Sequence, residues 1–162
     1  MRIVWFLVAA VLGLAAALFL LGQFGFLRGR APSDLGVRDG RLKPPALTPN
    51  SVSSQADLYP SHPQQAFSNI KPLKFTGDSG QALTRLADLL RNMSGMIIIA
   101  QEPEYLYLQS TSSLLKFTDD VEFAVDREAQ VIHVRSASRI GRKDFNVNRG
   151  RIETIRAQVE AN

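Results

Sequence analysis

The chain contains no cysteine, and this absence excludes disulfide bonds, thiolate catalysis and cysteine-ligated zinc or iron–sulfur sites. Histidine is almost as scarce: only His62 and His133 are present, and no cluster of ligands at metal-site spacing accompanies either. There is also no glycine-rich phosphate loop and no dinucleotide-binding fingerprint. The sequence therefore predicts no metal site and no cofactor.

An uneven distribution of charge is superimposed on an ordinary globular composition. The 162 residues are 45% hydrophobic and 21% charged, with a formal net charge of +4. Residues 78–126 hold eight acids against three bases, whereas residues 135–156 hold seven bases against two acids. We expect the two stretches to neutralise each other within one domain, and a basic patch for phosphate or lipid headgroups is the alternative. Nucleic-acid binding is disfavoured, because few aromatic residues are interleaved with the basic ones.

The N-terminal region is an unbroken apolar run of 19 residues from Ile3 to Leu21. As a helix it would span roughly 28 Å, which matches a hydrocarbon core of about 30 Å. Trp5 lies near one end of the run, and Arg28 lies beyond the other, as expected at a bilayer interface. We predict a single-pass anchor over residues 1–28 with the lipid bilayer as its partner. A cleaved signal peptide is the alternative, but its apolar region is usually about 7–15 residues and ends in small residues.

The next segment is rich in proline and shows no helical or strand period. Residues 29–66 contain six of the eight prolines. Because proline fixes φ and removes a backbone donor, we predict an extended linker whose second half packs on the domain. The domain itself is predicted over residues 67–162.

Within the domain, the hydrophobic pattern changes from helical spacing to alternation and back. Asp78 or Ser79 can cap a helix that stops at Gly95, and a last helix is predicted from Asn148. Between them lie five predicted strands: Met96–Ala100, Tyr105–Gln109, Leu114–Phe117, Val121–Val125 and Val131–Ser136. This order predicts an α+β fold, an antiparallel meander covered by two helices on one face and wet on the other.

The register of the last hairpin follows from its apolar faces. The apolar face of each of the two strands must point to the core. If the turn is residues 127–130, this requirement sets Phe123 opposite Val134 and Glu122 opposite Arg135. A shift of two residues would instead bring Asp120 opposite Arg135. Either register predicts that Arg135 pairs with a carboxylate on the polar face.

Several of these stretches resemble a known family. They are Pro49-Asn-Ser-Val-Ser-Ser-Gln, Phe117-Thr-Asp-Asp-Val-Glu-Phe, the run from Val131 that contains Arg-Ser-Ala-Ser-Arg, and residues 144–152. Over residues 49–159 the chain resembles the bacterial and plastid family called domain of unknown function 1499. The family commonly has cysteine where this chain has Ser51, so a thiol role there is excluded.

The resemblance and the charge pattern point to opposite sides of the membrane. Some relatives look like exported lipoproteins, which implies the periplasmic side of a bacterial inner membrane and a place in the cell envelope. The positive-inside rule instead favours the cytoplasm, because basic residues follow the apolar run and only Arg2 precedes it. The resemblance tips the prediction slightly toward the periplasm.

Two groups of polar residues are candidate sites. Asp120 and Glu122 share a strand face and are weak candidates for acid–base catalysis, but a nearby Arg135 would neutralise them. An anion site could instead be built from guanidinium groups, hydroxyls and a helix N-terminus, and its candidates are Arg135, Ser136, Ser138, Arg139, Asn148 and Arg149. The competing interpretation is that these arginines bind Asp119, Asp120 and Glu122 internally.

Asp144, Asn146 and Asn148 carry oxygen ligands at alternate positions, like the start of a calcium loop. The match then fails, because position six is Arg149 instead of glycine and position twelve is Ile155 instead of glutamate. Helix capping explains these residues better.

Two functional hypotheses remain. The first is a non-enzymatic, membrane-tethered module that binds an anionic ligand or a partner protein. The second is a hydrolase-like enzyme that uses Asp120, Glu122 and Arg135 in a polar cleft.

Overall fold

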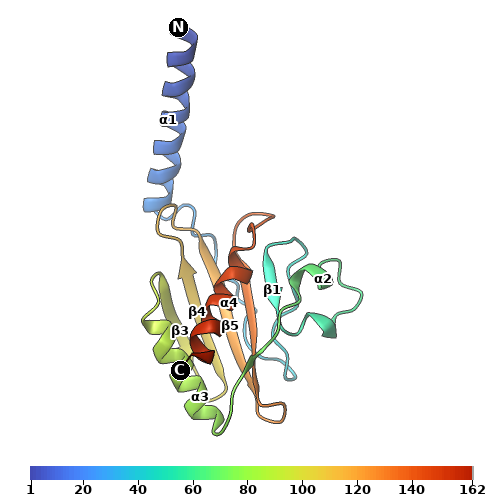
Figure 1. Ribbon diagram of the computed structural model, residues 1–162. Coiled ribbons are helices and arrows are strands. Elements are labelled where there is room, and N and C mark those ends of the chain that lie inside the picture. Colours follow the sequence, from blue (N-terminus) through green and yellow to red (C-terminus); the bar gives the residue numbers. More distant parts are fainter. Residues whose placement is uncertain (162) are drawn as a thin grey trace.

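The computed structural model describes residues 1–161 and shows one apolar helix leading into an α+β domain (Figure 1). The elements in chain order are α1 (Arg2–Gln23), β1 (Ser51–Ser53), the 3₁₀ helix η1 (Ala56–Leu58), α2 (Gln65–Ser68), β2 (Leu73–Lys74), α3 (Ser79–Arg91), β3 (Met96–Gln101), β4 (Tyr105–Thr111), β5 (Thr118–Asp126), β6 (Val131–Ser138) and α4 (Val147–Glu160).

The sheet is antiparallel throughout, in the order β1-β6-β5-β4-β3, with β2 pairing the start of β6. The predicted meander is confirmed in β3 to β6. The predicted register is also confirmed, since Phe123 lies opposite Val134 and Glu122 opposite Arg135. The predicted pairing of Arg135 with a carboxylate is confirmed by its ion pair with Glu122.

The predicted strand Leu114–Phe117 is wrong. Residues 112–117 form the connection between β4 and β5, in which the Ser112 amide bonds the Phe117 carbonyl at 2.9 Å. Lys116 adopts a left-handed φ of 58°, which breaks the extended path. The apolar Leu114 and Phe117 therefore face outward at a turn, where a short run of apolar residues had suggested a strand.

Helices α3 and α4 cover one face of the sheet and bury the main core there. Asp78 caps α3 through its side chain, which accepts from the Gln81 amide at 2.8 Å. Leu83, Leu86 and Leu90 then follow at helical spacing and are buried. Ile152 and Ile155 form the matching stripe on α4, and the inward residues of β4, β5 and β6 supply the opposing surface.

The other face of the sheet is covered as well, so the prediction of a face open to water is wrong over β5 and β6. Seven successive residues of β5 are buried. A strand with one face in water would instead alternate buried and exposed residues. The cover is the proline-rich segment between α1 and α2, in which Leu42 is 1% exposed. Its second half enters the sheet as β1, and its first half also packs against β5 and β6.

Helix α1 stands clear of the domain (Figure 1). It is the one described helix long and apolar enough to cross a membrane, and none of its apolar window is buried. Only its last turn contacts the domain, where Gln23 Nε2 donates to the Leu114 carbonyl at 2.9 Å. Gly22 allows this approach, because a Cβ there would lie 2.5 Å from the Leu115 carbonyl oxygen.

Candidate functional site

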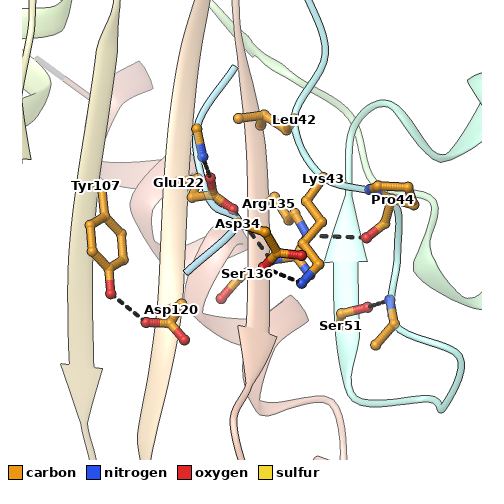
Figure 2. Close-up of polar contacts among 12 residues, drawn as sticks. Asp34, Leu42, Lys43, Pro44, Ser51, Tyr107, Asp120, Glu122, Arg135 and Ser136 are labelled. Carbon is orange, nitrogen blue, oxygen red and sulfur yellow. Dashed lines mark hydrogen bonds and ion pairs between the residues drawn. The ribbon is translucent and has the colours of Figure 1, made fainter. Parts of the chain in front are cut away.

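The covered face of the sheet holds a sealed layer of ionised side chains (Figure 2). Glu122 has no exposed surface, and Arg135 Nη1 lies 3.3 Å from its Oε2. The Oε1 atom of Glu122 accepts from the Gly36 amide and the Tyr105 hydroxyl, each at 2.8 Å. Arg135 Nε also donates to the Pro44 carbonyl at 3.3 Å. The covering segment thus supplies partners to both members of the ion pair.

A second ion pair lies beside the first on the same face. Arg139 donates to both oxygens of Asp120, from Nη2 at 2.6 Å and from Nε at 2.9 Å, and this hydrogen bonding raises the pKa of Arg139. The Tyr107 hydroxyl also donates to Asp120, at 2.6 Å. Burial, followed by the charge and hydrogen bond of Glu122, raises the pKa of Tyr105 far above its ordinary value. Both tyrosines therefore remain protonated donors to carboxylates at neutral pH.

The helix-covered face holds a separate polar network at the start of α4. Arg151 Nη2 pairs with Asp119 Oδ2, and Arg151 Nη1 donates to Ser136 at 2.9 Å and to Asn148 at 2.7 Å. Asp144 accepts from the Asn148 amide at 2.9 Å and from its side-chain Nδ2 at 2.8 Å. The structure thus agrees with the capping interpretation of this stretch.

The six predicted anion-site residues do not converge on one surface. Arg135 and Arg139 belong to the covered face, whereas Ser136, Ser138 and Asn148 belong to the network on the helix-covered face. Arg149 lies apart from both groups, where its guanidinium donates to the carbonyls of Asn69 and Phe67 at the end of α2. The odd and even residues of β6 point to opposite faces, and this separates the arginines from the serines.

The two carboxylate candidates are likewise enclosed. Both oxygens of Glu122 and both of Asp120 accept hydrogen bonds from the protein, and each residue is at most 1% exposed. Neither carboxylate lines the cavity of about 430 Å³ in the covering segment, although Gly36 and Pro44, which bond Glu122 and Arg135, do line it. A catalytic pair needs access to substrate, which this arrangement denies.

Several structural partners escaped the sequence analysis. Arg156 donates to the carbonyls of Lys71 and Pro72, as Arg149 does to Phe67 and Asn69, so α4 holds the segment before β2 at several carbonyls. The seven-residue spacing of the two arginines places them on one helix face, a signal that was available in the sequence. Buried Ser51 Oγ accepts from the Ala46 amide at 2.8 Å (Figure 2), which is a structural role.

A groove of about 1160 Å³ lies between α3, the end of α4 and β2, and is here called the α3–α4 groove. Its floor is apolar, and the most accessible apolar side chains in it are Phe75, Leu89, Met93 and Val159. These side chains pack on the main core from outside and are themselves only partly buried. Its volume is slightly above that of typical ligand sites, which measure about 300–1,000 Å³ and are mostly apolar.

The rim of this groove is basic. Lys74 and Arg85 line it, and neither side chain has a hydrogen bond or an ion pair within residues 1–161. Asp88, also on the rim, is neutralised by Arg91. The groove thus joins an apolar floor to two positive charges that have no partner among the described residues. The sequence analysis did not identify this pairing, because the lining residues come from four separate elements.

These features define a small α+β domain that follows an apolar N-terminal helix. The family model described as "Protein of unknown function (DUF1499)" matches residues 41–159, and the chain belongs to this family. No curated protein and no solved structure matches the chain. The match confirms the resemblance seen in the sequence. It also begins inside the proline-rich segment, so the family's unit includes part of the cover over Glu122 and Arg135.

Proposed function

We propose that the protein is a single-pass membrane protein whose domain is a non-enzymatic binding module for an anionic amphiphile. The ligand class is a single acyl chain with an acidic head, held in the α3–α4 groove. The observation that carries this proposal is the combination in that groove of an apolar floor with the unpaired Lys74 and Arg85. An acyl chain would bury apolar surface on the floor, and its head group would meet the two cations.

Helix α1 supports the membrane part of the proposal. Its 22 residues would span about 33 Å at 1.5 Å each, enough to cross a bilayer core of about 30 Å. The helix has no polar face to present to water, as a helix packed on a protein core would have, and the domain leaves its apolar residues exposed. A helix retained in the bilayer accounts for this exposure, whereas a cleaved signal sequence would leave the mature chain without it.

The enclosure of the polar residues supports the non-enzymatic part. Glu122 is satisfied by Arg135 and the covering segment, and Asp120 is satisfied by Arg139 and Tyr107, so that each carboxylate is at most 1% exposed. The hydrolase-like alternative would require the cover to move away and expose two ion pairs. No observation favours that opening.

The test is photocrosslinking of the full chain in nanodiscs of zwitterionic lipid, with palmitic acid that carries a diazirine on its chain as the probe. We expect labelled peptides from residues 73–94 and from the end of α4. Lys74→Gln with Arg85→Gln should reduce this labelling roughly two- to thirtyfold, since exposed charge pairs contribute about 0.2–1 kcal/mol each. Arg127→Gln removes a charge from the β5–β6 turn and serves as the matched control.

Two further results decide the outcome. A diazirine-bearing hexadecanol, which lacks the acidic head, should label the groove less than the acid and equally in both proteins. Labelling confined to residues 2–23, or unaffected by the double substitution, would refute the ligand assignment. Intact mass of the isolated protein should include α1, and recovery in the soluble fraction without detergent would refute the anchor.

A further inference from the structure

Three loops meet at the end of the domain where α1 enters (Figure 1). They are residues 24–30, 112–117 and 139–147, here called the α1-end loops. Hydrogen bonds at the loop ends hold them close: Gln23, which precedes the first loop, donates to the Leu114 carbonyl at 2.9 Å. The Arg139 amide donates at 3.4 Å to the carbonyl of Thr118, which follows the second loop. Gly29 also touches the third loop, because a Cβ there would lie 2.7 Å from the Arg139 Cβ. The three loops therefore form one continuous surface.

This surface exposes large apolar side chains that no part of the described domain covers. Phe145 is 89% exposed and Leu114 63% exposed. Together with these two, the exposed apolar residues of the loops include Phe24, Phe26, Phe117 and Ile140. Scattered apolar residues are ordinary on a protein surface, but their concentration on adjoining loops at one end is not.

The backbone around Phe145 adds a second observation. Phe145 has a left-handed φ of 52° and Asn146 one of 65°, and a bulky side chain rarely adopts this conformation. Buried Asp144 holds the turn by accepting from the Asn146 and Asn148 amides. The chain thus keeps an unfavourable backbone geometry that points a phenylalanine away from the domain, as residues at contact sites often do.

The charge of the α1-end loops is of one sign. Their exposed or half-exposed cations are Arg28, Arg30, Lys116, Arg142 and Lys143, and none of these has an ion pair within residues 1–161. Asp144 is the one acid in the three loops, and it is buried in the helix cap. Apolar side chains rimmed by unpaired cations complement the interface of a bilayer with anionic headgroups.

We propose that the α1-end loops dock on the anionic surface of the same bilayer that holds α1, with Phe145 and Leu114 in the interfacial region. This proposal rests on the membrane anchoring proposed above, because α1 brings the loops to that surface. Docking would hold the domain in a fixed orientation against the membrane. A tether alone would instead leave the domain free to tumble. The α3–α4 groove would then keep a fixed height above the headgroups.

The absence of cysteine makes a direct test possible with single-cysteine variants of the full chain. Phe145→Cys, Leu7→Cys and Glu128→Cys are each labelled with an environment-sensitive fluorophore and reconstituted in vesicles of equal parts phosphatidylcholine and phosphatidylglycerol. Leu7 reports on α1, and Glu128 on the β5–β6 turn at the opposite end of the sheet. Quenching by a lipid-borne nitroxide is measured for each.

We expect strong quenching at positions 7 and 145 and little at 128. Adding Lys116→Gln, Arg142→Gln and Lys143→Gln, or using phosphatidylcholine alone, should lower quenching at 145 at least twofold and leave position 7 unchanged. Quenching at 7 with none at 145 would overturn the docking and leave the anchor intact. Loss of quenching at 7 would instead refute the proposed membrane anchoring itself. Quenching at position 145 that changes neither with lipid charge nor with the triple substitution would refute the anionic surface as the partner.

Discussion

At the scale of single residues, the main feature is the ion pair of Glu122 and Arg135, which the fold removes from solvent. Their register on adjacent strands followed from sequence, but their environment did not. Two charges removed from solvent lose hydration, and their mutual attraction recovers this loss only when additional hydrogen bonds satisfy both groups. Here Gly36, Tyr105 and Pro44 supply those bonds. Removal of one partner would therefore leave an uncompensated buried charge.

We predict that Glu122→Gln lowers the free energy of unfolding by about 3–5 kcal/mol, since it leaves the Arg135 guanidinium buried without a counter-charge. Urea denaturation of the full chain in detergent measures this change. Glu128→Gln, in the exposed β5–β6 turn, is the control and should stay within about 0.5 kcal/mol of the wild type. Unchanged stability of Glu122→Gln would show that the pair does not support the fold.

His133 gives the domain a pH dependence of defined sign. Burial lowers the pKa of His133, and the neighbouring Asp126 only partly opposes this effect. Below about pH 6.5 the unfolded chain binds a proton at His133 more readily than the folded chain does. The free energy of unfolding is therefore highest above that pH and decreases as the pH falls toward the lowered pKa of the folded chain. We predict a falling melting temperature between pH 7.5 and 5, and a shallower fall in His133→Gln. Equal slopes in the two proteins would contradict the assignment.

At the scale of elements, the proline-rich segment is the part whose role depends most on its surroundings. It lacks the hydrophobic period of a helix or a strand, yet it carries Leu42 into the interior and donates the Gly36 amide to Glu122. Gln55 fixes it further, since its side chain accepts from the Leu42 amide at 2.8 Å and donates to the Gly40 carbonyl at 3.0 Å. The segment thus acts as an irregular third layer of the domain.

Leucine truncation tests whether this layer belongs to the folded unit. Leu42→Ala should lower the free energy of unfolding by about 2–5 kcal/mol, as expected for a fully buried leucine. Leu47→Ala, in the same segment but 75% exposed, is the control and should change it by less than about 0.5 kcal/mol. Equilibrium urea denaturation distinguishes the two, and equal effects would mean that the segment is a detached spacer.

Helix α4 shows how one element serves several functions in the fold. Its apolar stripe closes the core, Asp144 accepts a hydrogen bond from the Asn148 amide in its first turn, and Arg151 pairs with Asp119 on the sheet. Arg149 and Arg156 hold the carbonyls of the chain before β2. The basic stretch of the sequence is therefore largely occupied by internal acids and carbonyls, as the charge distribution predicted.

At the scale of the whole molecule, the two unoccupied surfaces lie in different places. The α1-end loops gather exposed apolar and basic side chains beside α1, whereas the α3–α4 groove opens between the helices toward β2. The charged residues that were candidates for chemistry in the sequence belong to neither surface and form ion pairs inside the fold. The proposed functions therefore depend on what the fold leaves uncovered.

The sequence by itself determined the apolar helix, the meander and the hairpin register, because each depends on local composition or on a period of two or about 3.6 residues. It also indicated the family, through the resemblance of its motifs. It also determined that Asp119 and Asp120 point to opposite faces, since neighbours on a strand must. Local periodicity does not encode what covers a face. Only the tertiary structure decided that the second face is dry, that the arginine and serine candidates are separated, and that an apolar groove stays open between α3 and α4. Each of these results depends on contacts between segments far apart in the chain.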